Sequence, residues 1–337
     1  MYSMQDVARL AGVSSATVSA VINRKGTVSP ALTERVQKAM EALDYHPDQI
    51  ARSLRVGHSK IIGMIVPDIS NWYFAEIIRG VEEFSEQKGY SVILCDSKDD
   101  TTRERQYMDM LYSRRVDGIL LASSTSQAIN DLRLLQRTPI VFIDSVPAGF
   151  ESDAVIVDNT QAAYAATRHL VDLGHRRIAI ISGRLDRSVG VERMNGYRKA
   201  MHEAKLWTPD ELIQVGDFHV ESGYKCGLTL MNLAVPPTAV FVCNNRMTLG
   251  LLHALGELKV DCPGRVSVVC FDDADWATSF IPHLTCVAQP THEMGKSAAE
   301  MLLEKLNGDE KYTYRQYPIT VLQAQLQVRD STAAPLA

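Results

Sequence analysis

Residues 4–23 read MQDVARLAGVSSATVSAVIN, and this stretch decides the fold of the N-terminal part of the chain. Its apolar residues recur at the spacing of two short helices that break at Gly12. Gly12 provides the permissive backbone of a tight turn, and Ser14 can cap the second helix. The inward faces then consist of Val7, Ala8, Leu10, Ala11, Val18, Val21 and Ile22. This pattern predicts a helix-turn-helix.

The second of these helices has the properties of a recognition helix. Its outward residues Ser15, Ala16, Ser19 and Ala20 are short enough to let a helix enter the major groove of DNA. Because the pattern is short and degenerate, a helical hairpin inside a globular core is the alternative interpretation.

The length and composition of the chain restrict the class of protein to which it can belong. With 337 residues, and roughly 150 residues per domain, it should hold two or three domains. Hydrophobic residues make up 46% and charged residues 22%, which is typical of a globular protein, and no run approaches the ~18 apolar residues of a membrane span. The first residues lack a basic region followed by an apolar stretch. We therefore expect no secretory signal and a cytoplasmic protein.

The charge is distributed unevenly along the chain. Residues 1–60 carry eight Lys or Arg against five Asp or Glu, a net charge of +3, and the remainder carries 27 against 35, a net charge of -8. Only the N-terminal part therefore suits a polyanion. Because +3 neutralises few phosphates, we expect a dimer, which doubles the contacts.

A third helix should follow the first two. Ser29-Pro30 pairs an N-cap with a proline at the first helical position, and apolar residues then recur at helical spacing. Pro47 disfavours a helical residue before it, so the helix should end there. We predict a three-helix head over residues 1–46, followed over 47–57 by a hinge helix and linker that is marginal without tertiary contacts.

Several short motifs follow one another in this part of the chain: Asp6-Val7-Ala8, Ala11-Gly12-Val13-Ser14, Thr17-Val18-Ser19, Val21-Ile22-Asn23, Val28-Ser29 and Ala51-Arg52-Ser53-Leu54. In their order and spacing they resemble the head and hinge of the lactose-repressor and galactose-repressor (LacI/GalR) family of bacterial transcription regulators. The resemblance implies that the hinge helices of two subunits pair in the DNA minor groove, where Leu54 wedges between base pairs and Arg55 lies in the groove.

The resemblance assigns DNA contacts to nine positions: Ser14, Ser15, Ala16, Thr17, Ser19, Ala20, Asn23, Leu54 and Arg55. One position departs from the family, because many relatives carry a long polar side chain where this chain has Ala20. Base reading there would rest on methyl contact, which makes the operator sequence less predictable. A plain linker in which Leu54 packs on the core is the alternative for the hinge.

Beyond the hinge the pattern changes to short apolar runs separated by amphipathic helical stretches. The runs are 61–66, 92–95, 119–121, 140–143, 178–181, 240–243 and 266–271. Continuous apolar runs fit parallel strands buried on both faces, so we predict an α/β core of doubly wound parallel sheets. About 270 residues are too many for one sheet, which favours two lobes. The resemblance likewise implies a two-lobed core similar to periplasmic sugar-binding proteins.

We place this effector-binding and dimerisation core at residues 58–330. In binding proteins of this kind the chain crosses between the lobes more than once. The expected first lobe is about 58–158 plus 289–317, and the expected second lobe is about 159–288 plus 318–330.

Polar and aromatic residues follow several of the apolar runs. In open parallel sheets ligands bind beyond the carboxyl ends of the strands, so these residues should line a cleft. The resemblance assigns the effector to Asn71, Tyr73, Phe74, Asp144, Arg187, Arg193, Phe218, Asn244, Asp272 and Gln289. Arg193 would span two hydroxyl groups, and the aromatic residues would sandwich a ring. Core packing of the aromatic residues and a helix N-cap role for Asp272 are the alternatives.

The class of ligand stays open between two candidates. Arg187 and the Tyr73-Phe74 pair resemble a purine-binding relative, whereas Val189 replaces a hydroxyl of the purine site and Ser145 replaces an arginine of ribose binders. We predict a monosaccharide or a derivative of one, with a purine nucleobase or nucleoside as the second choice.

The sequence carries no motif of a common enzyme class. It contains no G-x-S-x-G, no G-x-x-x-x-G-K-[ST] and no G-x-G-x-x-G after a strand, so we expect neither catalysis nor a cofactor. The Asp272, Asp273 and Asp275 cluster needs no metal, because carboxylates at strand ends can bind hydroxyl groups. We predict an effector-controlled homodimeric repressor that binds a pseudo-palindromic double-stranded operator. A solute-binding protein without DNA function is the more remote alternative.

Overall fold

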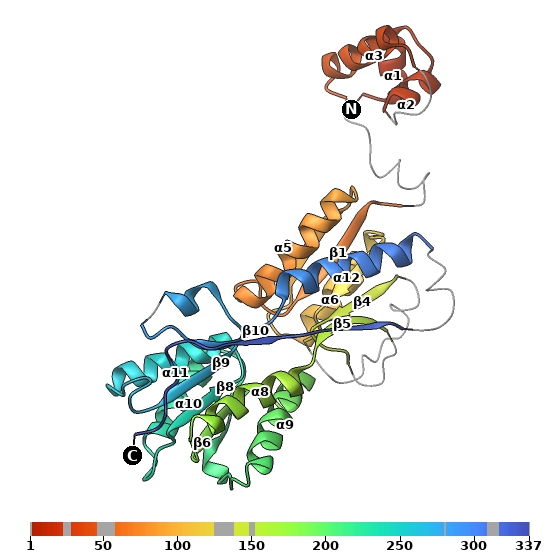
Figure 1. Ribbon diagram of the computed structural model, residues 1–337. Coiled ribbons are helices and arrows are strands. Elements are labelled where there is room, and N and C mark those ends of the chain that lie inside the picture. Colours follow the sequence, from red (N-terminus) through yellow and green to blue (C-terminus); the bar gives the residue numbers. More distant parts are fainter. Residues whose placement is uncertain are drawn as a thin grey trace. The chain divides into compact units, whose positions relative to one another are not determined.

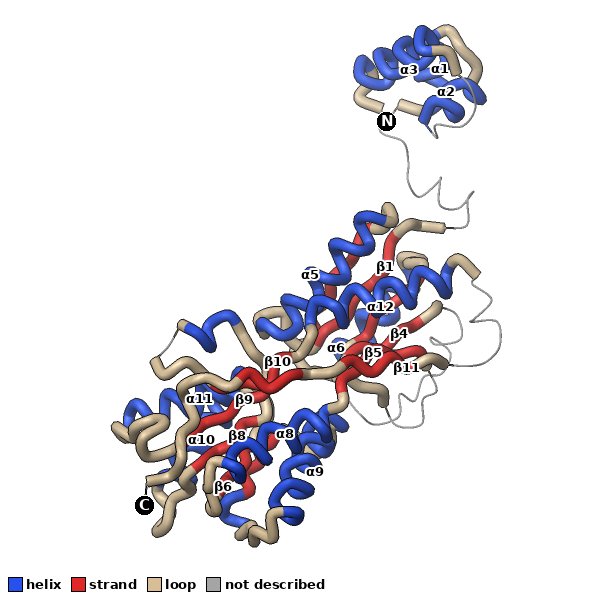
Figure 2. Tube along the Cα trace, in the orientation of Figure 1, coloured by secondary structure: helices blue, strands red, loops and turns tan. Residues whose placement is uncertain are grey.

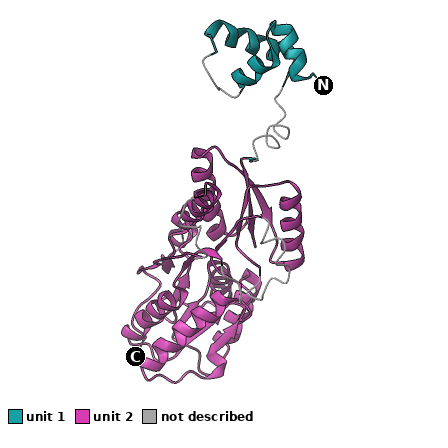
Figure 3. Cartoon of the chain, turned by 90° about the vertical axis from the view of Figure 1, so that its right-hand side faces the viewer, with its two compact units in different colours: residues 1–59 teal, residues 60–337 magenta. Residues whose placement is uncertain are grey.

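The computed structural model describes residues 2–22, 28–45, 58–124, 138–147, 152–279, 281–308 and 317–336. The chain divides into two units, residues 1–59, here called the head, and residues 60–337, here called the core (Figure 3). In the described residues, no helix combines the length and the apolar character needed to cross a membrane.

Residues 2–22 and 28–45, the part of the head that the structure describes apart from 58–59, form three helices, and the predicted helix-turn-helix is confirmed. They are α1 (Met4–Ala11), α2 (Ser15–Ile22) and α3 (Pro30–Ala42) (Figure 1). Ser3 caps α1 in a reciprocal capping box with Asp6, and Gly12 ends the helix with a φ of 62°. The Ser14 hydroxyl then accepts a hydrogen bond from the backbone N–H of Thr17 at 3.1 Å, which starts α2.

A small apolar core holds the three helices together. Val7, Val18 and Val36, one from each helix, are fully buried against one another. Arg35 of α3 adds a polar tie, because its Nη2 donates to the carbonyl oxygen of Ala11 at 2.6 Å. The expectation that Leu10 faces inward is wrong. It lies to one side of the buried face of α1 and is 56% exposed.

Within its described ranges the core holds two six-stranded sheets. The first has the strand order β11-β5-β4-β3-β1-β2, and all of its neighbouring strands are parallel. Its strands are β1 (Ile61–Val66), β2 (Ser91–Asp96), β3 (Gly118–Leu121), β4 (Ile140–Ile143), β5 (Asp153–Val157) and β11 (Ile319–Leu322). Successive residues of β1 point to opposite faces. Met64 packs with α5 (Trp72–Gln87) and α12 (Thr291–Leu306), and Ile65 packs with α6 (Thr101–Ser113). This sheet and its helices are the first lobe.

The second sheet has the order β12-β10-β9-β8-β6-β7 and is parallel except for β12, which runs antiparallel to β10. Its strands are β6 (Ile178–Ser182), β7 (Ile213–Val215), β8 (Ala239–Val242), β9 (Ser267–Phe271), β10 (Thr285–Ala288) and β12 (Gln325–Gln327).

Two helix pairs enclose the second sheet, and together they form the second lobe (Figure 1). One pair is α8 (Asn159–Asp172) and α9 (Ser188–Glu203), and the other is α10 (Val220–Met231) and α11 (Asn245–Glu257). Two short 3-10 turns, η1 (Asp210–Leu212) and η2 (Asp275–Thr278), complete it. Strands buried between helix layers explain why the apolar runs are continuous, and the predicted two-lobed α/β fold is confirmed.

The chain passes between the lobes after β5, after β10 and after β11 (Figure 2). The assignment of 318–330 to the second lobe is wrong for its first part, because β11 is hydrogen-bonded to β5 in the first sheet. The physical reason is that β11 is a short edge strand rather than a buried one. Its Ile319 and Val321 are 53% and 47% exposed, so it lacks the continuous buried run on which the strand prediction depended.

Candidate functional site

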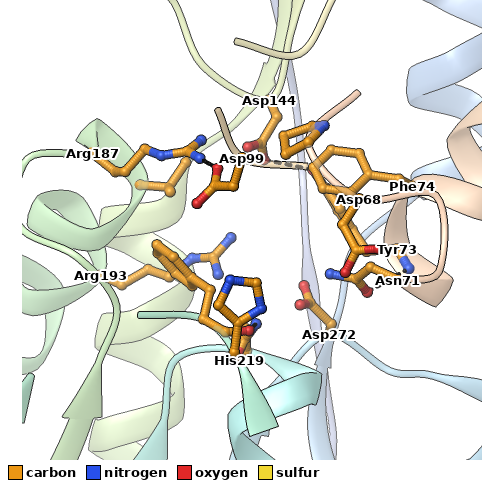
Figure 4. Close-up of a pocket in the computed structure, with 14 residues that line it drawn as sticks. Asp68, Asn71, Tyr73, Phe74, Asp99, Asp144, Arg187, Arg193, His219 and Asp272 are labelled. Atoms are coloured by element: carbon orange, nitrogen blue, oxygen red, sulfur yellow. Dashed lines mark hydrogen bonds and ion pairs between the residues drawn. The ribbon is translucent and has the colours of Figure 1, made fainter. Parts of the chain in front are cut away.

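A cavity lies between the two lobes, at the carboxyl ends of strands from both sheets. It encloses about 590 Å3 of space, part of which is open to solvent. Its lining consists of Pro67, Asp68, Asn71, Tyr73, Phe74, Asp99, Asp144, Arg187, Val189, Arg193, Phe218, His219, Asn244 and Asp272 (Figure 4). This is the place at which open parallel sheets bind ligands.

Nine of the ten residues that the sequence assigns to an effector line this one cavity. The tenth, Gln289, stands behind Asp272 and donates from Nε2 to Asp272 Oδ1 at 2.6 Å. The sequence prediction missed Asp99 and His219. Asp99 comes three residues after the end of β2, so the rule that ligands bind beyond the carboxyl ends of strands could have found it.

Four lining residues adopt a left-handed backbone although none of them is glycine. The φ angles are 58° at Asp99, 72° at Asp144, 71° at Phe218 and 73° at Asp272. Each such residue costs on the order of 1–3 kcal/mol and is found mainly where the surroundings enforce it, often at ligand sites. The four side chains are thus directed into the cavity at the expense of backbone strain.

Burial changes the electrostatics of the two central carboxyl groups. Burial raises the pKa of Asp144 to about 6, although the nearby Arg193 lowers it. Burial likewise raises the pKa of Asp272, again against the effect of Arg193. Tyr73 donates its hydroxyl to Asp144 Oδ1 at 2.7 Å, and its own pKa is raised well above the usual value, mainly by burial. Tyr73 therefore stays a hydrogen-bond donor.

Arg193 is the central cation of the cavity, where its guanidinium lies among the lining side chains (Figure 4). Its Nε donates to Asn159 Oδ1 at 2.8 Å, and Nη1 donates to the carbonyl oxygen of Cys243 at 2.5 Å. The guanidinium also lies 3.7 Å from the centre of the Phe271 ring. Because Nε and Nη1 already donate to the protein, Arg193 contributes mainly a positive charge that is held at a fixed position in the cavity. It offers a ligand less of its guanidinium fork than the sequence interpretation assumed.

Two predicted effector residues have roles in the framework. Asn71 caps α5 by accepting from the N–H of Tyr73 at 3.1 Å. Asn244 caps α11 by accepting from the N–H of Met247 at 2.9 Å, and its Nδ2 donates to the carbonyl oxygen of Phe218 at 2.9 Å. The second bond holds the strained Phe218 loop in place.

Side chains bridge the lobes on one side of the cavity. Asn245 Nδ2 donates to Asn71 Oδ1 at 3.0 Å. Next to this bond, Arg246 Nη1 donates to Ser70 Oγ at 3.0 Å and lies 3.7 Å from Asp68 Oδ2.

A second bridge involves Asp99 of the first lobe. It is ion-paired with Arg184 and Arg187 of the second lobe, and Arg187 also donates to the carbonyl oxygen of Ser123 at 2.9 Å. The lobes are therefore held closed around the cavity by polar contacts at two places.

The raised pKa of Asp144 predicts a pH dependence of stability. In the range from about pH 4 to pH 6 the native state keeps a proton that the unfolded chain has released, so stability falls as pH rises through this range. The isosteric Asp144→Asn variant has no titrating group at this position, so it lacks this pH-dependent part of the free energy of unfolding. Urea unfolding should show the wild-type chain losing about 2–3 kcal/mol relative to the variant between pH 4 and pH 7. A difference that does not change with pH would contradict the assignment.

The predicted DNA-contacting residues of the head are accessible where the structure describes them. Ser14, Ser15 and Ala16 are exposed, and Thr17, Ser19 and Ala20 are half-buried. Asn23, Leu54 and Arg55 lie outside the described residues. The structure thus leaves one side of α2 open for a partner, and the contacts themselves remain predictions.

Comparison with known proteins places both units in one family. Residues 3–48 match the bacterial regulatory proteins of the lacI family, and residues 167–332 match the periplasmic binding protein-like domain. The transcriptional repressor PurR of Vibrio atlanticus is 38% identical over 324 residues, covering 94% of this chain and 96% of the relative. PurR of Histophilus somni is 37% identical over 326 residues, covering 96% and 98%.

Solved structures agree with these relatives. The Lac repressor dimer bound to operator and the anti-inducer ONPF superimposes with a TM-score of 0.87 at 26% identity, covering 99% of both chains. The complex of the regulator CelR with cellobiose has a TM-score of 0.74 at 30% identity and covers 98% of this chain and 100% of that one. The chain therefore belongs to the lacI family of bacterial regulatory proteins, as a DNA-binding regulator of transcription.

Proposed function

We propose that the chain is a transcriptional repressor whose affinity for its operator is set by a small molecule bound between the lobes. The observation that carries this proposal is the cavity between the lobes, in which side chains of both lobes meet around residues with a strained backbone. A ligand that contacts both lobes binds best to the closed form and shifts the population toward it.

The proposal extends to a homodimer on a pseudo-palindromic operator. One support is the small positive charge of the head, because a single copy can neutralise only a few DNA phosphates. The other is the similarity to a Lac repressor that binds operator as a dimer. In this mechanism lobe closure changes the spacing of the two first lobes and so the DNA affinity of the heads. Couplings of this kind are typically ~1–3 kcal/mol.

For the effector we favour a purine base or nucleoside over the monosaccharide that the sequence ranked first. The relatives at 37–38% identity are named PurR, which supports a purine. The cavity presents aromatic rings from opposite lobes, Phe74 and Phe218. Several of its polar atoms are already engaged, including those of Asn244 and two nitrogens of Arg193. A flat base needs fewer polar partners than a sugar, whose every hydroxyl group requires one.

A sugar stays as the second candidate because solved relatives hold one. Besides the cellobiose complex, a lacI-family regulator of Enterococcus faecium with bound ribose superimposes with a TM-score of 0.71 at 28% identity, covering 81% of this chain and 99% of that one.

Thermal unfolding of the full chain in the presence of candidate ligands tests the effector class. Purine bases and nucleosides are expected to raise the melting temperature in a concentration-dependent way, because a ligand that binds only the native state stabilises it by mass action. Pyrimidine bases serve as the matched control, because they can also stack on aromatic side chains but lack the two-ring shape of a purine. Stabilisation by a monosaccharide and by no purine would reverse the choice.

The position of Phe218 predicts the effect of one small substitution. A methyl group on Gly183 would lie 1.9 Å from Cζ of Phe218, so the Gly183→Ala variant must displace the ring within the cavity. We expect effector affinity to fall about tenfold, which corresponds to about 1.4 kcal/mol. Calorimetric titration with the stabilising ligand measures it. The control is Gly256→Ala, where the methyl group meets nothing within 4 Å. Unchanged affinity in Gly183→Ala would remove Phe218 from the site.

A further inference from the structure

Asp99 occupies an unusual position at the cavity. It lies between β2 and α6 in the first lobe and reaches the start of α9 in the second lobe (Figure 4). Its φ of 58° is left-handed, which is uncommon for a residue other than glycine. Its Oδ2 lies 3.3 Å from Arg184 Nη1, and its Oδ1 is ion-paired with Arg187 Nη2.

Arg187 would be a natural anion-binding group without Asp99. Its side chain is only 8% exposed, and its buried Nε has no hydrogen-bond partner among the residues that the structure describes. Burial lowers its pKa to about 10, which still leaves the guanidinium charged at neutral pH. Arg187 is also the N-cap residue of α9, a helix of 16 residues whose N-terminal end favours negative charge. Asp99 therefore fills the place that an anionic group of a ligand would take.

The rest of the cavity reinforces the exclusion of anions. Its lining includes four carboxyl groups, those of Asp68, Asp99, Asp144 and Asp272, against two guanidinium groups, those of Arg187 and Arg193. A phosphate group placed at Arg187 would lie beside the Asp99 carboxylate, and such like-charge contacts are a strong means of rejecting a wrong ligand.

We propose that Asp99 is a specificity-determining residue that acts as an internal counter-ion for Arg187 and restricts the cavity to effectors without a phosphate group. The inference rests on the proposed function, in that it describes the ligand of the same cavity. It predicts that bases, nucleosides or free sugars are accepted and that their phosphorylated forms are rejected.

Inorganic phosphate is the probe that tests this charge selection without knowledge of the effector. It is titrated calorimetrically into the full chain at constant ionic strength, maintained with chloride. The wild-type chain is expected to bind no phosphate saturably. The Asp99→Asn variant keeps the shape of the side chain and removes its charge. It should bind phosphate saturably, with an affinity at least ~10-fold above the upper limit that the titration sets for the wild-type chain. Adding Arg187→Gln to this variant should abolish the gain in phosphate affinity.

Asp186→Asn is the matched control for the loss of a carboxylate near Arg184. Asp186 pairs with Arg184 but does not line the cavity, so this variant should bind phosphate no better than the wild type. If Asp99→Asn is unstable by circular dichroism, Asp99→Ser makes the same test. Asp99 would be only a structural bridge between the lobes if both variants fold and neither gains phosphate affinity, and that result would overturn the inference.

The same variants separate this inference from the proposed effector. Purine bases and nucleosides, which carry no phosphate, are titrated into the wild type and into Asp99→Asn. Absence of purine binding to both, together with gained phosphate binding by the variant, would remove the purine and leave the charge selection standing. If purines bind to both chains and the variant gains no phosphate binding, the purine effector stands and the charge selection by Asp99 is overturned.

Discussion

Replacing Arg193 by Met is expected to lower the free energy of unfolding of the core by about 3–5 kcal/mol at pH 8. The side chain is 4% exposed and donates hydrogen bonds to Asn159 and to the carbonyl oxygen of Cys243. Met fills part of the volume and retains contact with the Phe271 ring, so the loss reports mainly on the missing charge and hydrogen bonds. Urea unfolding of the full chain, followed by circular dichroism, measures this change.

The loss should depend on pH in a way that identifies its cause. Arg193 lowers the pKa of both Asp144 and Asp272, so without it the two carboxyl groups keep their protons to a higher pH in the native state. The variant therefore loses stability more steeply than the wild type as pH rises, and its deficit should be smaller at pH 5 than at pH 8. Arg198→Met, on the exposed side of the same helix, should change stability by less than about 0.5 kcal/mol. A deficit equal at both pH values would contradict the charge argument.

Replacing Val18 by Asp is expected to abolish specific DNA binding while leaving the core folded. Val18 is fully buried between the helices of the head. A carboxylate at this position has no partner, and the cost of several kcal/mol exceeds what a head of about 45 residues can supply. Specific binding should fall by roughly the 10^3-fold or more that separates specific from non-specific affinity. Fluorescence anisotropy with operator DNA measures it.

The control for this variant places the same substitution on the surface of the same unit. Leu10→Asp introduces a carboxylate at a side chain that is 56% exposed, and the head should keep its helical circular dichroism signal. The melting of the core and its effector affinity should be unchanged in both variants, because the head and the core are separate units. Loss of effector affinity in Val18→Asp would contradict this independence.

Local chemistry made much of the head and of the cavity predictable. Gly12 and Ser14 specify the turn between α1 and α2 through backbone freedom and capping, both of which act within a few residues. The carboxyl ends of parallel strands bring Asp144 and Asp272 to one cavity, although 128 residues separate them in the chain. Both inferences needed only short-range patterns and one rule of sheet topology.

Long-range pairing set the limits of that prediction. The sequence spacing does not indicate that Asp99 meets Arg184 and Arg187, because the contact depends on how the lobes close. Likewise, exposed residues alternate with half-buried ones in β11, so its pairing with β5 could not be inferred from its composition. The sequence likewise does not indicate the partners of Arg193, since Asn159 and Cys243 come from other elements of the second lobe.

Effector control of DNA binding is tested most directly by titrating DNA with the full chain in the presence and absence of effector. A double-stranded site is first selected from a random-sequence pool, and its affinity is then measured by fluorescence anisotropy at two salt concentrations. We expect sequence-specific binding that weakens with salt and changes at least ~5-fold when a stabilising purine is added. A selected site whose affinity is unaffected by every ligand that stabilises the chain would contradict effector control.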